Sequence, residues 1–236
     1  MELQPWEYLL KTIAWKQLEF IKGKKVLDFG SGYGITANHF ATDNNVVAVE
    51  PSKEMLESAV KDNNYMQIQG GVEALEKFED ESFDVVICHN VLEYVSDREK
   101  VLKEFNRVLK KDGIISVIKH NRAGRVMQMV VLLNDFDEAE NLLNGGNSEA
   151  KQFGTINYYE DEYLIDELCK ISDYELNKNY GIRTFWDLQQ NQEIHKDKEW
   201  QKKMIMIENK VSEMDEYREI AFFHHLIMKK NTVTSI

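Results

Sequence analysis

The segment Lys25 to Gly34, KVLDFGSGYG, constrains the fold of this chain more than any other. It reads as an apolar strand that ends in an acid, enters a glycine-rich turn and continues into a helix over residues 35–41. This is the opening unit of a doubly wound α/β domain, in which ligands bind at the carboxyl ends of the strands. Because Gly30, Gly32 and Gly34 lack side chains, we expect the turn to adopt positive φ and to approach a ligand closely.

The next strand, residues 45–50 (NVVAVE), also ends in an acid, Glu50. A carboxylate at this position can accept hydrogen bonds from the ribose hydroxyls of an adenosine group. A dinucleotide site requires the spacing G-x-G-x-x-G, so that a helix end faces the pyrophosphate. Here the third glycine comes one residue early, which favours a cofactor without phosphate, S-adenosylmethionine (SAM).

The pattern hhDhGxGxG, with Asp28 two residues before the first glycine, resembles motif I of the class I SAM-dependent methyltransferases. Further segments resemble later motifs of the same family in the same order: Glu50-Pro51-Ser52, Gly71-Val72-Glu73, residues 83–89 (FDVVICH) and residues 110–113 (KKDG). The resemblance implies a Rossmann-like α/β fold, doubly wound around a mostly parallel seven-stranded sheet with an antiparallel last strand. It also implies SAM as cofactor and S-adenosylhomocysteine as product.

The resemblance assigns the cofactor to residues at the carboxyl ends of the first four strands. These residues are Asp28, Gly30, Ser31, Gly32, Glu50, Pro51, Met55, Gly71, Val72, Glu73 and His89. Glu50 is expected to hold the ribose. Val72 and Glu73 are expected near the adenine edge.

Length and composition limit the remaining alternatives. The 236 residues, of 27.7 kDa, allow a single α/β domain over 1–236, and a net charge of −12 argues against an extensive nucleic-acid surface. The longest apolar run is too short to span a bilayer and the amino end lacks signal-peptide features, so we expect a cytoplasmic protein without membrane contact. Cys88 and Cys169 have no paired spacing, and the adjacent His224 and His225 point to opposite faces of a strand, so no metal site is predicted.

Two segments outside the expected sheet are candidates for mobile elements. Residues 1–22 form an amphipathic helix that either covers the cofactor as a lid or simply packs on the sheet. Residues 122–157 are rich in Met and Leu and form a helical cap insertion, either mobile over the active site or rigid at the sheet edge. A near-heptad apolar run over residues 200–214 predicts a further packed helix, with a core neighbour or a dimer partner.

Methyl transfer from a sulfonium is an in-line displacement in which the protein mainly supplies position. A general base is needed only if the acceptor atom must lose a proton. His89 and His120 are the candidates, because histidine titrates near neutral pH, although either can equally be a structural hydrogen-bonding residue.

The carboxyl half resembles the bacterial tRNA 5-carboxymethoxyuridine methyltransferases. The resemblance rests on residues 119–124 (KHNRAG), residues 181–187 (GIRTFWD) and the ending around Tyr217, Ala221 and His225. It implies esterification of a carboxylate on a wobble uridine, which needs a cation rather than a base. Arg183 would supply that cation, since its planar fork suits a carboxylate.

The general methyltransferase resemblance implies a substrate-facing loop over residues 119–125, which contains Asn121 and Arg122, so these two residues join Arg183 as candidate substrate residues. A tRNA substrate also requires a basic face, which the fold must gather from Lys22, Lys24, Lys25, Arg122, Arg125 and the lysines of residues 196–203. Two other functions remain open: a methyltransferase for a small-molecule acid or amine, and a non-catalytic SAM-binding regulatory protein.

Overall fold

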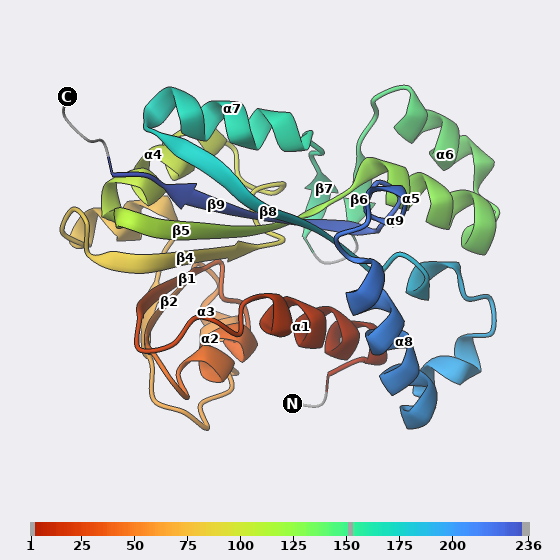
Figure 1. The fold of residues 1–236 in the computed structure, drawn as a ribbon, viewed down its shortest axis with the longest axis horizontal. Helices are drawn as coiled ribbons and strands as arrows, with labels where there is room; N and C mark the ends of the chain where they lie inside the picture. The colour runs from red at the N-terminus through yellow and green to blue at the C-terminus, as the bar shows by residue number, and fades with distance from the viewer. Residues whose placement is uncertain (1–2, 151–152, 233–236) are drawn as a thin grey trace. The chain divides into compact units, whose positions relative to one another are not determined.

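Seven strands form one sheet in the order β3-β2-β1-β4-β5-β9-β8 in the computed structural model, which describes residues 3–150 and 153–232 (Figure 1). The strands are β1 (Lys25–Phe29), β2 (Asn45–Glu50), β3 (Met66–Gln69), β4 (Phe83–His89), β5 (Leu109–His120), β8 (Tyr174–Ile182) and β9 (Phe223–Lys230). Strand β1 runs parallel to β2 and β4, and β2 runs parallel to β3. The last strand, β9, is the antiparallel one. The predicted doubly wound, mostly parallel sheet is confirmed.

The strand order reverses beside β1, which has β2 on one side and β4 on the other. In a doubly wound sheet, such a reversal separates the loops that follow the two strands and leaves room for a ligand at their carboxyl ends. The run Val46 to Val49 in β2 is fully buried, as expected of a central parallel strand covered on both faces. The helices that follow β1, β2 and β4 are α2 (Ile35–Phe40), α3 (Lys53–Glu57) and α4 (Arg98–Val108).

Helix α4 ends at Val108 and β5 begins directly after it at Leu109, so Gly113 lies within the strand, although a glycine commonly ends a helix. The backbone N–H groups of Glu81 and Ser82 donate to the carbonyls of Arg107 and Val108, at 2.9 and 2.8 Å. These bonds satisfy carbonyls that a glycine-containing C-cap would otherwise have to satisfy.

The chain divides into two compact units. Unit 1 consists of the described residues of Met1–Glu19, Ile118–Tyr159 and Asn179–His225, and unit 2 of those of Phe20–Val117, Glu160–Lys178 and Leu226–Ile236. Unit 2 contains the glycine-rich turn, the helices named above and α7 (Asp161–Ile171). In its core, the ring of Phe29 from β1 meets the ring of Phe105 from α4 edge to face, with centroids 5.2 Å apart.

The core of unit 1 joins helix α1 (Pro5–Gln17) to helix α8 (Lys198–Val211). Leu9, Leu10 and Ile13 of α1 are buried, and Trp200 and Met204 of α8 pack against the same apolar cluster. The predicted helices are therefore present and have a core neighbour. The near-heptad pattern holds only in part, since the run also includes Ile207 and Met214, whose exposed fractions are 49% and 42%. A lid function for residues 1–22 stays a prediction.

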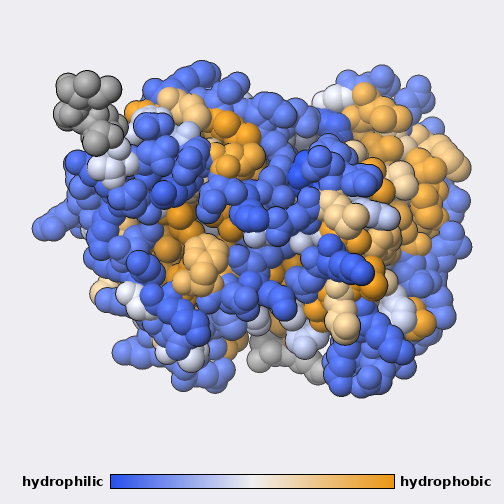
Figure 2. Space-filling view, in the orientation of Figure 1, coloured by the Kyte–Doolittle hydropathy of each residue, from blue (hydrophilic) through white to orange (hydrophobic). Residues whose placement is uncertain are grey.

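The insertion at residues 122–157 is only partly helical. It contains helix α5 (Arg122–Gln128), a π-helical turn η2 (Met129–Leu133), helix α6 (Phe136–Leu143) and a hairpin of β6 (Ser148–Ala150) and β7 (Gly154–Ile156). The hairpin was not predicted, because three-residue strands are too short to show a period in the sequence. Leu133, Phe136 and Leu143 are exposed, and Figure 2 shows apolar side chains gathered over α5 and α6. The mobile-cap function stays a prediction.

Unit 1 also contains a buried histidine, from which we predict that the folding stability of the protein falls at acidic pH. His225 is fully buried, its Nδ1 lies 2.6 Å from Oε1 of Gln17, and burial lowers its pKa to about 3. The unfolded chain protonates this residue near pH 6.5, so the stability that depends on neutral His225 is lost as the pH falls from 6.5 toward 3. At pH 5 the expected loss is about 2 kcal/mol relative to pH 7.

Urea unfolding at pH 5 and pH 7 measures this loss. The matched variant is His225→Phe combined with Gln17→Leu, which removes the titrating group and its partner together. We expect the double variant to show a pH dependence smaller by about 2 kcal/mol. Equal pH dependence in the two proteins would contradict the assignment.

Candidate active site

The glycine-rich turn folds back onto the end of β2. The backbone N–H groups of Gly30 and Ser31 both donate to the carbonyl of Val49, at 2.8 and 3.1 Å. Gly30 and Gly32 have φ values of 74° and 55°, which residues other than glycine rarely adopt. These two bonds fix the turn at the carboxyl edge of the sheet, where a ligand of a doubly wound fold binds.

The glycines of this turn serve different purposes. A β-carbon at Gly30 would come within 2.3 Å of Val91, so glycine is needed here to make room for the loop that follows β4. A β-carbon at Gly34 would meet the Tyr65 hydroxyl. At Gly32, its two chain neighbours aside, no atom of the described residues lies within 4 Å of the position of a β-carbon. Of the three, Gly32 is therefore the one whose missing side chain leaves open space for a ligand.

Glu50 organises the same edge. Its carboxylate is buried and accepts the N–H of Gly32 at 2.8 Å through one oxygen and the N–H of Ser52 at 2.9 Å through the other. Each carboxylate oxygen can accept more than one hydrogen bond, so both retain capacity for a ribose hydroxyl. The carbonyl of Glu50 accepts the N–H of Gly70, which connects the turn after β3 to this edge.

Two further side chains at this edge are suited to a polar ligand. Ser31 Oγ and Asn90 Oδ1 are buried and have no hydrogen-bond partner within residues 3–150 and 153–232. Buried polar atoms are normally paired, so both predict a partner that the chain itself does not supply. The ammonium and carboxylate groups of the methionine part of SAM provide such partners. The residues present thus fit SAM, and Asp28, buried in β1, lies two residues before Gly30.

The remaining predicted cofactor residues lie after β2 and β3. Helix α3 begins after Ser52, whose side chain accepts the N–H of the predicted residue Met55; Pro51 precedes this cap. The short helix η1 (Val72–Lys77) follows Gly71, and Glu73 accepts the N–H of Gly71 at 2.7 Å. Hydrogen bonds from the backbone N–H groups of Gly71 and Glu73 lower the pKa of the Glu73 carboxyl. A contact of these residues with adenine stays a prediction.

His89 ends β4 in unit 2, and its Nε2 lies 2.8 Å from the hydroxyl of Ser116 in β5. This bond orients the ring and engages one of its two nitrogens. A general-base function for His89 stays a prediction.

A cavity of about 670 Å³ in unit 1 brings together His120, predicted as a candidate base, and Arg183, predicted to bind the substrate. Aromatic rings form much of its wall: Trp6, Trp186, Phe222 and Phe223. The His120 ring lies 4.8 Å from the ring of Phe223, centroid to centroid. The cavity therefore combines flat apolar walls with the Arg183 cation, beside the acids Asp187 and Glu193, and suits a planar ring whose anionic group can reach Arg183.

Arg183 is held in place by a buried ion pair. Its Nε donates to Oδ2 of Asp187 at 2.8 Å, and its Nη2 donates to Oδ1 of the same carboxylate. The guanidinium carbon lies 4.6 Å from the ring centroid of Phe222 and 5.4 Å from that of Trp6. Nη1 has no hydrogen-bond partner within the described part of the chain, so it remains available to a carboxylate in the cavity.

The loop that carries Arg183 is fixed by a residue that the sequence did not reveal. Glu208 of α8 is buried and accepts the backbone N–H groups of Thr184, Phe185 and Trp186, at 2.8, 2.8 and 3.1 Å. Three donors on one carboxylate hold the turn in which Arg183 adopts a φ of 67°. A single glutamate on an amphipathic helix carries no local sequence signal for this function.

His195 is a second residue that the sequence analysis missed. Its ring stacks on Trp186 in the cavity wall, with centroids 4.3 Å apart and an interplanar angle of 12°. Burial lowers the pKa of His195, with Asp187 acting in the opposite direction, and the lowered pKa favours the neutral ring. The sequence contains only an indirect signal for His195, which is that its stacking partner Trp186 lies three residues after the predicted substrate residue Arg183.

The other two predicted substrate residues do not line this cavity. Asn121 caps α5 by accepting the N–H of Ala123, and its amide donates to the carbonyls of Glu219 and Ala221, both at 2.9 Å. Arg122 donates to the carbonyls of Leu142 and Gly146 within the insertion. Both side chains thus have structural partners, and substrate contacts for them stay predictions.

Comparisons with known proteins agree with this geometry. Residues 27–117 match the methyltransferase domain family (Methyltransf_11). The uncharacterized methyltransferase YcgJ of Bacillus subtilis is 34% identical over 102 residues, or 41% of this chain and 40% of that protein. The tRNA 5-carboxymethoxyuridine methyltransferase of Escherichia coli K12 is 22% identical over 237 residues, or 94% of this chain and 88% of that protein.

Solved structures show the same fold. The YcgJ structure from Bacillus subtilis aligns with a TM-score of 0.58 and 19% identity, over 97% of this chain and all of that one. A SAM-dependent methyltransferase from Thermotoga maritima aligns with a TM-score of 0.62 and 20% identity, over 97% of this chain and 91% of that one.

The sheet order and the match of residues 27–117 to the methyltransferase domain support a class I SAM-dependent methyltransferase, the class that the sequence resembles. That family and fold imply SAM as the cofactor. None of the helices in residues 3–150 and 153–232 has the length and apolar character that a bilayer span requires. No group of three or more His, Cys, Asp or Glu side chains in the same residues is placed to hold a metal ion.

The different purposes of the glycines give a matched pair of variants. Gly32→Ala adds a β-carbon in open space at a φ of 55°, so we expect a stability loss of about 1 kcal/mol but at least a tenfold weaker affinity for SAM. Gly30→Ala adds a β-carbon 2.3 Å from Val91, so we expect mainly a loss of stability, of roughly 1–3 kcal/mol. Calorimetric titration with SAM and urea unfolding measure the two effects. Unchanged SAM affinity in Gly32→Ala would show that this glycine does not face the cofactor.

Proposed function

We propose that this enzyme transfers the methyl group of SAM to a carboxylate on a wobble uridine of tRNA. The observation that carries the proposal is the buried guanidinium of Arg183 in an aromatic-walled cavity with His120. The E. coli relative that aligns over 94% of the chain carries the name of that activity.

The chemistry requires no proton transfer. A carboxylate is ionised at neutral pH, so its oxygen can attack the methyl carbon directly. The new bond joins that oxygen to the methyl carbon, the sulfur–carbon bond of SAM breaks, and S-adenosylhomocysteine leaves. The task of the protein is to position and partly neutralise the acceptor, for which the Nη1 group of Arg183 is suited. With this acceptor His89 and His120 position groups by hydrogen bonds or ring contacts and need not act as bases.

The basic groups predicted for an RNA-binding face are distributed unevenly. Arg122 is engaged by carbonyls of the insertion, and Arg125 donates to Gln128. Lys24 and Lys25 lie in unit 2 around a cavity that also contains Asp43 and Asp84. The lysines of residues 196–203 are exposed; Lys196 and Lys202 form ion pairs with Glu193 and Glu199, which leaves Lys198 and Lys203 best placed for an RNA phosphate.

Transfer of label from methyl-labelled SAM tests the proposal. The acceptors are tRNA that carries 5-carboxymethoxyuridine, and a cell extract separated into RNA, protein and small-molecule fractions. We expect label in tRNA that mild base releases as methanol, because a methyl ester hydrolyses there whereas a methyl group on a base or ribose does not. Label in RNA that resists base would contradict a carboxylate acceptor.

The same experiment decides the two other functions. A methyltransferase for a small acid is favoured by the size of the aromatic cavity, about 670 Å³, which can enclose a free ligand. It predicts label only in the small-molecule fraction. A regulatory SAM-binding protein predicts no label in any fraction.

A further inference from the structure

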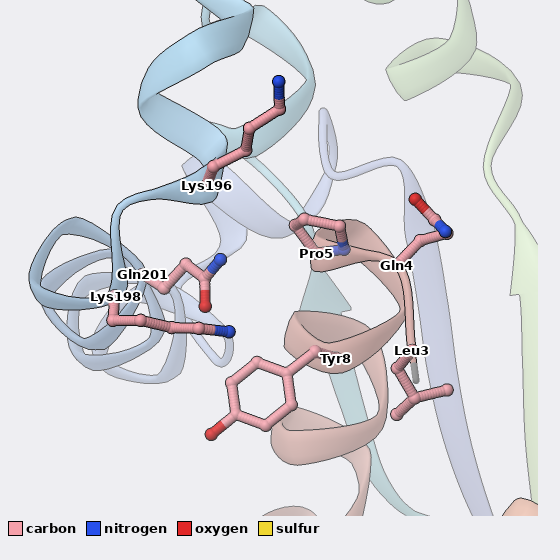
Figure 3. A pocket seen from close by; sticks show the side chains of 7 residues that line it. All are labelled: Leu3, Gln4, Pro5, Tyr8, Lys196, Lys198 and Gln201. Atoms are coloured by element: carbon pink, nitrogen blue, oxygen red, sulfur yellow. The ribbon is translucent and has the colours of Figure 1, made fainter. Parts of the chain in front are cut away.

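A second cavity in unit 1, of about 480 Å³, adjoins the one that contains Arg183 (Figure 3). The two cavities share Pro5 and Lys196 in their walls. An occupant of the second cavity would therefore lie beside an occupant of the first. The elements that form it are the start of α1 and the start of α8, which pack together in the core of unit 1.

The side chains around the second cavity are suited to an anion next to a ring. Lys198 is exposed, its Nζ lies 5.8 Å from the ring centroid of Tyr8, and no acid within the described residues forms an ion pair with it. Tyr8 is exposed, with an exposed fraction of 43%. No acidic residue is among the described residues that line the cavity, although the chain has a net charge of −12.

A buried amide supplies a third recognition group. Gln201 has an exposed fraction of 2%, and its Nε2 donates to the carbonyl of His195 at 2.6 Å. That carbonyl can only accept, so the nitrogen faces it and Oε1 is left as an acceptor. Oε1 has no hydrogen-bond partner among the residues that the structure describes, and Figure 3 shows the end of this side chain directed into the cavity. A buried acceptor of this kind predicts a donor on the occupant.

We propose that the second cavity binds the nucleotide next to the modified uridine in the RNA. Its phosphate would meet Lys198, its base would stack on Tyr8, and a base amino group or ribose hydroxyl would donate to Gln201. Stacking on an exposed ring and phosphate contact by lysine are the usual means of holding a single-stranded nucleotide. The inference rests on the proposed function, since it assumes an RNA substrate with its uridine in the first cavity.

The test compares two substrates: an anticodon stem-loop RNA that carries 5-carboxymethoxyuridine, and the free nucleoside, which fills the first cavity alone. We expect Lys198→Ala to lower kcat/KM for the RNA about fivefold to twentyfold, mainly through KM, and to reduce the salt dependence of RNA binding by about one ion. We expect Tyr8→Ala to lower it roughly fivefold to 100-fold. Neither variant should change kcat/KM for the nucleoside.

The matched control is Lys210→Ala, which removes one exposed charge from the other end of α8 and should leave both substrates unaffected. If Lys198→Ala and Tyr8→Ala methylate the stem-loop as well as the unaltered enzyme does, the second cavity does not bind RNA, while the proposed function stands. If the unaltered enzyme methylates neither the stem-loop nor the nucleoside, the proposed function itself is wrong, and the inference falls with it.

Discussion

Replacing Glu50 with glutamine is expected to weaken SAM binding by about 100-fold. The carboxylate accepts the N–H groups of Gly32 and Ser52, one on each oxygen, and is predicted to accept the ribose hydroxyls as well. In glutamine, one of the two oxygens is replaced by an NH₂ group. That group would face the N–H of Gly32 or Ser52, so a hydrogen bond is replaced by two donors that face each other. The affinity loss comes from the bonds expected between the carboxylate and the ribose hydroxyls: charge-assisted bonds contribute roughly 1.5–3 kcal/mol each, and a loss of about 3 kcal/mol corresponds to about 100-fold in affinity.

Calorimetric titration with SAM and with S-adenosylhomocysteine measures this effect. Glu54→Gln is the matched control, because Glu54 makes the same charge change four residues later, on the exposed side of α3. We expect the control to bind both compounds normally, and both variants to unfold as cooperatively as the unaltered protein without ligand. SAM affinity within threefold of normal in Glu50→Gln would remove the ribose-binding function assigned to this residue.

The fold could be predicted because its signals are local and repeated. The signals all lie within about 25 residues of each other, and each specifies the same βαβ geometry. They are the apolar run Val46 to Val49, Asp28 near the end of β1, Glu50 at the end of β2 and the glycines between these acids. The sequence could not distinguish Gly30 from Gly32. Their different purposes depend on Val91, which reaches the turn from the loop after β4.

The substrate side was harder to predict, because its side chains find partners far away in the chain. Asn121 and Arg122 follow β5 as a substrate loop would, yet the amide of Asn121 donates to carbonyls about 100 residues later. Glu208 fixes the Arg183 loop from 24 residues away. Its partners are backbone N–H groups, which every residue except proline has, so the sequence does not indicate the contact. Sequence patterns show which residue types are present, but they do not show which backbone groups a distant side chain will satisfy.

The largest effect on methyl transfer is expected from Arg183→Met. The guanidinium and the carboxylate of Asp187 form a pair whose side chains have exposed fractions of 8% and 6%. Removing one partner leaves a buried, uncompensated charge, so we expect the single variant to lose about 3–5 kcal/mol of unfolding free energy. Lost activity in that variant alone would therefore not separate binding from folding.

The double variant Arg183→Met, Asp187→Leu separates the two. Replacing both members of a buried pair with apolar side chains of similar size is often neutral for stability, so we expect the double variant to recover most of the unfolding free energy. Its kcat/KM for the carboxylate of 5-carboxymethoxyuridine should nevertheless remain at least 100-fold below that of the unaltered enzyme, because no cation is left to orient the acceptor. Urea unfolding and label transfer from SAM measure the two quantities, and normal SAM affinity shows that the cofactor site in unit 2 is intact. A stable double variant with kcat/KM within tenfold of normal would show that the acceptor is oriented by another group, and that Arg183 holds the loop rather than the substrate.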